Sequence, residues 1–341
     1  MASFSSDFDP DSVTDVKSIT LTSFIMRHTR DNNLAILMNA IQLSCKSITR
    51  AVRKAGIANL YGLAGTENST GDAVKKLDLL SNEIMINALT HSHVCSVLVS
   101  EENEDPIIIK ENMQGKYCVA FDPLDGSSNI DCNVSTGTIF AVYEKKEGSV
   151  GNIEDVMRAG IDLKVAGYCM YGTATELIIT FYGSGVHRFT LDPSLGEFIH
   201  VASDVKMPTE PKKIYSCNQG NYGGWDAPIQ RYVDGITAGD KPYALRYVGS
   251  MVSDVHRTLL YGGIFLYPAD KKSRGGKLRV LYEGFPMALI IEQAGGMAST
   301  GMFNGSIQRV LEIKPTSIHD KCPIILGTPS MVESVLKEYT A

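Results

Sequence analysis

The sequence predicts an α/β protein in which strands and helices alternate along the chain. Two apolar runs, 94–100 and 117–121, have the length and composition of buried strands, and acidic residues follow each run directly. Apolar residues at helical spacing over 34–54 indicate an amphipathic helix. With 341 residues, of which 44% are hydrophobic, the chain is long enough for one large or two ordinary domains.

The first half of the chain is expected to begin with helices and to continue into a largely antiparallel sheet. Residues 1–16 are acidic, and we expect them to form a flexible tail. Segment 60–72 is rich in glycine and small polar residues, so a mobile loop is predicted there. The predicted helices are 20–30, 34–54 and one that starts between Asp72 and Asp78, with Leu79, Ile84, Met85 and Leu89 on its apolar side. Glycine-rich turns separate the predicted strands 139–143, 165–170, 177–181, 186–190 and 197–199.

A proline- and lysine-containing linker at 207–213 places a domain boundary near residue 205. The expected domains are therefore 17–205, which includes the mobile loop 60–72, and 206–341. In the second domain, strands are predicted at 213–217, 263–267 and 277–283, and helices at 252–261 and 286–294. Strand 277–283 ends in Glu283, so it repeats the pattern of a buried strand that ends in an acid.

Carboxylates therefore follow three predicted strands. Like charges crowded near a core need a compensating cation, and ligands that are all oxygen suit magnesium or manganese. A simpler interpretation is that Asp122 and Asp125 cap a turn, and that Asp72 is an ordinary helix N-cap. Because adjacent strand ends open into one crevice, the repeated pattern favours a single metal cluster. Its candidate members are Glu101, Glu102, Asp122, Asp125 and Glu283, joined by Asp72 and Asp78.

Groups that can bind phosphate accompany these acids. The small residues Gly126, Ser127 and Ser128 leave backbone N–H groups uncovered directly after Asp125. Further donors are expected from Asn218, Arg246, Tyr247, Gly249, Ser250, Met251, Tyr267 and Lys277. Taken singly these are weak indications, because the tyrosines could be core aromatics and Lys277 a surface charge.

Composition and motifs exclude several classes of function. A net charge of −6 argues against a general nucleic-acid surface, and no apolar run approaches the roughly 20 residues that span a bilayer. The acidic first fifteen residues differ from a signal or transit peptide, so a cytoplasmic location is expected, or a plastid one if the N-terminus has been processed. The sequence has no Ser-His-Asp order, zinc spacing or GxGxxG motif, which argues against an acyl hydrolase, a zinc enzyme and a dehydrogenase.

The segment Asp-Pro-Leu-Asp-Gly-Ser-Ser at 122–128 resembles the signature of the lithium-sensitive, magnesium-dependent sugar and inositol phosphatases. The overlapping Ser-Ser-Asn-Ile-Asp at 127–131 resembles the fructose-1,6-bisphosphatase branch, and the resemblance extends from about residue 20 to the C-terminus. It implies a five-layered α-β-α-β-α sandwich and a homotetramer. It also implies hydrolysis of the 1-phosphate of fructose 1,6-bisphosphate, in gluconeogenesis or sucrose synthesis, to fructose 6-phosphate and orthophosphate.

The resemblance also implies a role for each candidate residue. Mg²⁺, or else Mn²⁺ or Zn²⁺, would bind Glu101, Asp122, Asp125, Glu283 and the backbone carbonyl of Leu124, with Asp72 joining when its loop closes. Glu102, oriented with Asp78, would take the proton of the attacking water. The amides of Ser127 and Ser128 would hold the 1-phosphate. The other phosphate would bind Asn218, Tyr247, Tyr267 and Lys277, with Arg246 reaching it from a neighbouring subunit.

Two other functions stay open at the level of sequence. A sedoheptulose-1,7-bisphosphatase or dual-specificity enzyme is disfavoured by Asn-Ile-Asp at 129–131. A non-catalytic sugar-phosphate sensor on the same fold would be expected to lose at least one acid of the cluster, and none is missing.

The resemblance makes a further prediction about inhibition by AMP. Segment 30–35, Arg-Asp-Asn-Asn-Leu-Ala, stands where AMP-inhibited animal members of the family have Gly-Thr-Gly-Glu-Leu-Thr. Glu144 stands where they use an arginine, and Lys116 and Tyr117 remain of the usual contacts. We expect an enzyme that is nearly insensitive to AMP, unless neighbouring side chains build a different nucleotide site.

Overall fold

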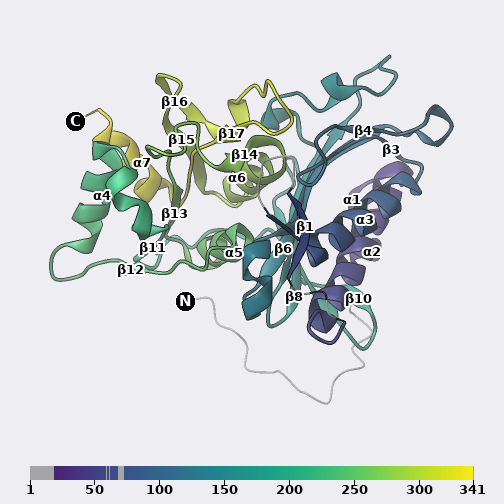
Figure 1. Cartoon of the computed structure of the whole chain (residues 1–341), viewed down its shortest axis with the longest axis horizontal. Coiled ribbons are helices and arrows are strands. Elements are labelled where there is room, and N and C mark those ends of the chain that lie inside the picture. The colour runs from purple at the N-terminus through teal and green to yellow at the C-terminus, as the bar shows by residue number, and fades with distance from the viewer. Residues whose placement is uncertain (1–18, 59, 61, 68–72, 341) are drawn as a thin grey trace.

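The computed structural model describes residues 19–340 except 59, 61 and 68–72, so the predicted tail 1–16 and Asp72 lie outside the described residues. Strands of the first half gather into a large sheet, and strands of the second half form a smaller one (Figure 1). None of the described helices has the length and apolar character that crossing a membrane requires.

Within the described residues, eight strands form the larger sheet in the order β10-β9-β8-β7-β6-β5-β3-β4. Neighbours are antiparallel except for β3 and β5, which run parallel with Ser100 opposite Phe121. The antiparallel sheet predicted for 139–199 is thus confirmed. The strands are β3 Cys95–Ser100, β4 Ile107–Ile108, β5 Tyr117–Asp125, β6 Thr136–Glu144, β7 Val165–Tyr171, β8 Thr175–Phe181, β9 Val186–Asp192 and β10 Glu197–Ala202.

Helices α1 (Leu21–His28), α2 (Asn32–Lys54) and α3 (Lys76–Thr90) cover one face of this sheet (Figure 1). Helix α2 begins at the N-cap Asp31, whose Oδ1 accepts hydrogen bonds from the backbone N–H groups of Asn33 and Leu34. The apolar side predicted for α3 is partly wrong, because Leu79 is 38% exposed. Leu77 packs inward instead, with Met85 and Leu89.

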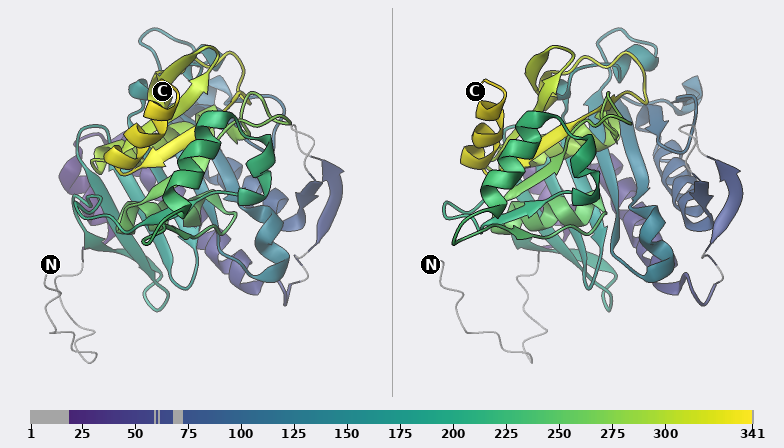
Figure 2. Two further views of the ribbon diagram at one scale, coloured as in Figure 1. Left: turned by 90° about the vertical axis from the view of Figure 1, so that its left-hand side faces the viewer. Right: turned by 60° about the vertical axis from the view of Figure 1, so that its left-hand side comes forward.

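In the described chain, the second sheet has six strands in the order β12-β11-β13-β18-β15-β16. Helices α5 (Met251–Tyr261) and α6 (Phe285–Gln293) lie between the two sheets, and α4 (Ala227–Thr237) and α7 (Pro329–Glu338) cover the outer face (Figure 2). The layers of this part of the chain therefore run helix, sheet, helix, sheet, helix, as expected. The strands are β11 Ile214–Ser216, β12 Ala244–Leu245, β13 Ile264–Tyr267, β15 Met297–Phe303, β16 Ser306–Arg309 and β18 Ile324–Gly327.

Two predicted elements differ from the structure. The loop predicted for 60–72 contains strand β1 (Leu63–Glu67), which pairs antiparallel with β2 (Ala73–Lys75). The predicted strand 277–283 is also wrong. Only β14 (Leu278–Arg279) is extended, pairing with β17 (Lys321–Cys322), and a π-helical turn, Val280–Gly284, follows and leads into α6. Residues 280–284 are buried on all sides, so their apolar run has no period that separates strand from helix.

Candidate active site

Two strand ends bring most of the predicted acids together. Because β3 and β5 are parallel neighbours, Glu101 and Glu102 follow β3 at the edge of the sheet where Asp122 and Asp125 complete β5. The register of β5 against β6 shifts between Asp122 and Asp125, and Asp122 Oδ1 accepts a hydrogen bond of 2.9 Å from Leu124 N. Asp122, Leu124 and Asp125 are all buried, so the acids lie at the margin of the core.

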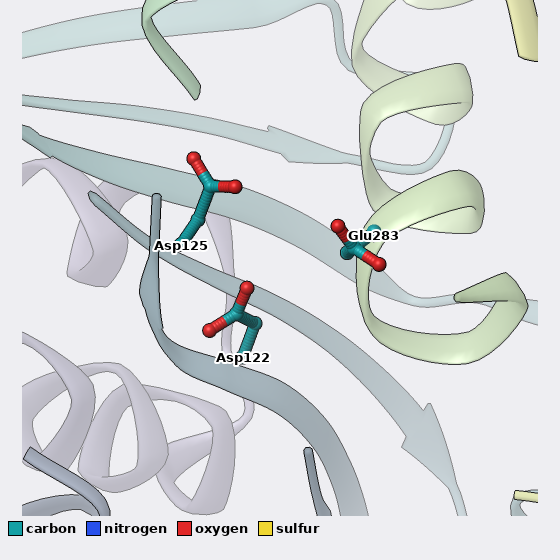
Figure 3. Close-up of side chains that lie close together, drawn as sticks. All are labelled: Asp122, Asp125 and Glu283. Atoms are coloured by element: carbon teal, nitrogen blue, oxygen red, sulfur yellow. The ribbon is translucent and has the colours of Figure 1, made fainter. Parts of the chain in front are cut away.

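A further acid, Glu283, comes from the other half of the chain. Glu283 lies on the π-helical turn 280–284, and its Oε2 accepts a 2.5 Å hydrogen bond from Arg279 N. Asp122, Asp125 and Glu283 each offer a carboxylate oxygen within 4.8 Å of the others, and Figure 3 shows the three side chains converging. The prediction that this acid joins the other two therefore holds, although the element that carries it is a helical turn.

Asp125 is held at the start of helix α5. Its Oδ2 accepts from Ser250 Oγ and Val252 N, both at 2.9 Å, and its Oδ1 accepts from Met251 N at 3.3 Å. The first N–H groups of a helix have no partner within the helix and carry partial positive charge, so a carboxylate there is stabilised. The same contact joins β5 of the larger sheet to a helix of the second half.

Burial and mutual repulsion raise the pKa values of the acids in the cluster. Burial raises the pKa of Asp122 well above its usual range, and the charges of Glu101, Asp125 and Glu283 add to the effect. Burial also raises the pKa of Asp125 to about 6, although the hydrogen bonds from the start of α5 oppose the rise. The pKa of Glu283 reaches about 8, first through burial and then through the charge of Glu101.

The donor set suits a hard divalent cation. Carboxylates and a backbone carbonyl are the ligands that magnesium and manganese prefer, whereas the three converging side chains offer neither sulfur nor imidazole. A bound cation would also reverse the electrostatic argument, because it stabilises the ionised carboxylates that burial disfavours. The cluster therefore has both the ligand chemistry and the excess of negative charge that a metal site requires.

Asp78 lies beside the cluster. It is buried in the first turn of α3, and its Oδ2 accepts a 2.9 Å hydrogen bond from Lys75 N. Burial raises its pKa to about 6. Lys75 Nζ pairs with Asp131 at 2.5 Å, so this part of the site contains a cation that the sequence analysis did not single out.

The acids line a cavity of about 570 Å³ together with most of the predicted phosphate ligands. Gly126, with φ of +75°, turns the chain directly after Asp125, and a side chain there would approach Ser250 Cβ to 2.8 Å. The predicted site residues that line this one cavity are Asp78, Glu101, Glu102, Asp122, Leu124, Asp125, Gly126, Ser127, Ser128, Asn218, Tyr247, Gly249, Met251, Tyr267, Lys277 and Glu283.

The remaining predicted residues lie elsewhere. Ser250 is buried behind the cavity, where it bonds to Asp125. Arg246 is exposed, and its Nη1 donates to the carbonyl of Leu245, so its predicted role at a neighbouring subunit stays a prediction. Asp72 lies outside the described residues, so its role also stays a prediction.

Arg279 is a cavity residue that the sequence analysis missed. Its side chain is almost fully buried, with Nη2 lying 3.2 Å from Glu101 Oε1 and Nη1 donating to the carbonyl of Lys277 at 3.0 Å. The signal was present, because Lys277 and Arg279 are two residues apart and residues at that spacing share a face of an extended segment. Asp254 was missed as well. It is fully buried, and its carboxylate accepts from Val248 N and Gly249 N, which fixes the loop that carries Tyr247.

Comparison with known proteins gives a consistent result over nearly the whole chain. Residues 19–203 match the family model described as the fructose-1-6-bisphosphatase N-terminal domain, and residues 207–340 match the C-terminal domain. The chain is 52% identical to the cytosolic fructose-1,6-bisphosphatase of Spinacia oleracea and 51% identical to that of Solanum tuberosum, each over 331 residues covering 95% of both chains.

Solved structures agree with the sequence comparisons. The crystal structure of Leishmania major fructose-1,6-bisphosphatase in holo form is similar to this chain, with a TM-score of 0.90 and 43% sequence identity. The similarity covers 95% of this chain and 99% of that one. The apo form of the same protein has a TM-score of 0.84.

Proposed function

The chain belongs to the fructose-1,6-bisphosphatase family, and we propose that it hydrolyses the 1-phosphate of fructose 1,6-bisphosphate in the cavity described above. The products are fructose 6-phosphate and orthophosphate. The observation that carries the proposal is the convergence of Asp122, Asp125 and Glu283 in the cavity that the Gly126–Ser128 segment also lines. Its named relatives are cytosolic, and we place this enzyme in the cytosol with them.

Acids on one side of the cavity would hold the metal, and donors on the other side would hold the substrate. Asp122, Asp125 and Glu283, with Glu101 and the Leu124 carbonyl, would bind magnesium, which neutralises phosphate charge and lowers the pKa of a bound water. Glu102, oriented with Asp78, takes the proton of the attacking water. The backbone amides of Ser127 and Ser128 hold the phosphate that is transferred, so in-line attack needs no protein nucleophile.

The second phosphate and the sugar would bind at the far side of the cavity. Asn218, Tyr247, Tyr267 and Lys277 line the same cavity as the acids and supply one cation and several hydrogen-bond donors. We further propose a homotetramer, in which the exposed Arg246 reaches the phosphate of an adjacent subunit. This assembly would place a second cation beside Lys277.

The decisive experiment measures phosphate release from fructose 1,6-bisphosphate and from sedoheptulose 1,7-bisphosphate, each with magnesium, manganese or zinc and with none. We expect turnover of the fructose ester that requires the metal. Faster turnover of the sedoheptulose ester would change the substrate assignment. Binding of either ester without any phosphate release would favour a sugar-phosphate sensor, and would contradict the proposed reaction.

We expect AMP to inhibit this enzyme at least about a hundredfold more weakly than it inhibits AMP-sensitive animal members of the family. Asp31 Oδ2 accepts from Tyr117 OH and pairs with Lys116 Nζ, both at 2.5 Å, so a carboxylate of the chain already occupies the two groups that remain of the usual AMP contacts. Lys116 also pairs with Glu144 at 3.2 Å. Each lost hydrogen bond to a charged group is worth roughly 1.5–3 kcal/mol, and a hundredfold is about 2.8 kcal/mol.

Titration of AMP against activity tests this expectation. The variant Asp31→Ala serves as the companion, because it frees Lys116 and Tyr117 and should make inhibition by AMP stronger. Half-inhibition of the unmodified enzyme at low micromolar AMP would show that Asp31 does not have the role given to it here.

A further inference from the structure

His319 connects the two halves of the chain next to the acid cluster. Its ring Nε2 lies 2.9 Å from the carbonyl oxygen of Asn103, and its Nδ1 lies 2.8 Å from the hydroxyl of Tyr282. A carbonyl can only accept, so Nε2 carries the proton and Nδ1 accepts from the tyrosine. One of these partners follows Glu102 in the chain, and the other precedes Glu283.

On one side, His319 belongs to a loop that is fastened to the turn bearing Glu283. The Asp320 carbonyl accepts a 2.8 Å hydrogen bond from Val280 N, and β17 pairs with β14 just before that turn. The Asp320 carboxylate accepts from Thr316 N and Ser317 N, which fixes the loop itself. These contacts hold the loop of His319 against residues 280–284.

On the other side, His319 contacts Asn103, and hydrogen bonds connect Asn103 to the backbone of Glu102. Asn82 on α3 donates to Asn103 Oδ1 at 2.9 Å and accepts from Ser100 Oγ at 2.7 Å. The same Ser100 oxygen accepts from Glu102 N at 3.2 Å. A shift of Asn103 would therefore displace the backbone of Glu102 through these hydrogen bonds.

We propose that His319 is a positioning residue, which sets the segment that carries Glu101 and Glu102 against the turn that carries Glu283. This inference rests on the proposed function, because it assigns His319 a role through the metal ligand Glu101 and the base Glu102. The two acid-bearing segments come from different halves of the chain, and a displacement of about 1 Å at a reacting centre can lower the rate about a hundredfold.

Tyr282 completes the connection. Its side chain is fully buried, its ring meets that of His319 edge to face with centroids 6.0 Å apart, and its hydroxyl supplies the proton that Nδ1 accepts. This contact fixes both the tautomer and the direction of the imidazole. Partners that bond directly to metal ligands typically change metal affinity or activity by 10–100-fold when they are replaced, and His319 acts on the acids through Asn103 and Tyr282, their neighbours in the chain.

Three variants test the proposal in the full-length protein. His319→Ala removes both hydrogen bonds, His319→Gln keeps a donor that can reach the Asn103 carbonyl, and Tyr282→Phe removes a single hydroxyl but keeps the buried ring. His91→Ala is the matched control, because His91 is exposed at the C-terminal end of α3 and its Nδ1 bonds to the Asn87 carbonyl of that helix. Each variant is assayed for kcat and KM with magnesium, for binding of Mn²⁺ by calorimetry without substrate, and for thermal unfolding.

For His319→Ala we expect kcat to fall about 10–100-fold while KM changes little, and Mn²⁺ to bind more weakly by a similar factor. In Tyr282→Phe, kcat and Mn²⁺ affinity should each fall about fivefold, as expected for the loss of one hydrogen bond. His319→Gln should recover part of the loss in both kcat and Mn²⁺ affinity. His91→Ala should match the unmodified protein.

A folded His319→Ala protein with unchanged kcat and unchanged Mn²⁺ affinity would overturn the proposal, whatever its melting temperature. If that variant does not fold, Tyr282→Phe and His319→Gln decide in its place, and unchanged kcat and Mn²⁺ affinity in both would overturn the proposal. If the unmodified protein releases no phosphate with any metal, the proposed function fails. The Mn²⁺ affinities of the variants then still decide on His319.

Discussion

Replacement of Glu102 by glutamine is expected to lower kcat by about 10²–10⁴-fold, the usual contribution of a positioned general base. Glutamine keeps the volume of the side chain and removes the group that would accept the proton of the attacking water. Glu102 lies in the turn after β3, where its N–H donates to Ser100 Oγ, and this backbone contact does not depend on the carboxylate. The variant should therefore fold normally and bind substrate with little change in KM.

Steady-state phosphate release at saturating magnesium, together with a thermal melt, measures the effect of Glu102→Gln. Glu104→Gln is the matched control, because it makes the same chemical change two residues further on at an exposed position. Activity of Glu102→Gln close to that of the unmodified enzyme, with a normal melt, would remove Glu102 from the mechanism.

Replacement of Asp122 by asparagine is expected to abolish most of the activity and, at the same time, to stabilise the protein when metal is removed. Asp122 is buried among Asp125, Glu283 and Glu101, so its charge is repelled on several sides. Removing that charge relieves the repulsion but also removes a metal ligand. Magnesium at about a hundred times its Kd stabilises a protein by about 2.7 kcal/mol, and most of this gain should disappear in the variant.

The pH dependence of stability is a second test of the repulsion among the clustered acids. Asp125, with a pKa of about 6, and Glu283, with a pKa of about 8, hold protons in the folded protein that they release in the unfolded one. Between about pH 4 and pH 8 the folded state thus binds more protons than the unfolded state. The free energy of unfolding therefore falls as pH rises through that window. With metal removed, the melting temperature should be lower at pH 8 than at pH 6. Saturating magnesium should weaken this dependence.

Melts of Asp122→Asn and of the unmodified protein, with magnesium and with chelator, at pH 6 and pH 8, test both statements. Asp105→Asn is the control, since Asp105 is exposed in the connection between β3 and β4. An equal rise in melting temperature on addition of magnesium to both proteins would show that Asp122 is not a metal ligand. A melting temperature that rises from pH 6 to pH 8 in chelator would contradict the repulsion argument.

Strand ends were the most predictable part of the site. The runs 94–100 and 117–121 are apolar and short, and each stops at charged residues, so periodicity, length and composition agree on a buried strand. Parallel neighbours place their ends together, which predicts that Glu101 lies near Asp122 once the two strands pair. Local sequence patterns suffice to predict the positions of these acids, because each acid lies where a strand ends.

Interactions between distant parts of the chain could not be predicted in the same way. Nothing local marks Glu283 as part of a helical turn, because residues 280–284 are buried on all sides and lack a period. The pairing of Lys75 with Asp131, and the two contacts of His319, depend on side chains that meet only after the sheets have packed. Such contacts are set by the tertiary arrangement, and the sequence shows only the residue types that take part.

The anchoring of Asp125 at the start of α5 also has a consequence for the order in which the protein is made. Its partners Ser250 and Val252 lie 125 and 127 positions further along the chain. At 5–20 residues per second, the ribosome needs about 6–25 s to reach them after Asp125 has been added. During this interval the nascent N-terminal half carries an acid destined for burial whose stabilising helix has not been synthesised. The end of β5 can therefore reach its final state only after synthesis has passed well into the second half.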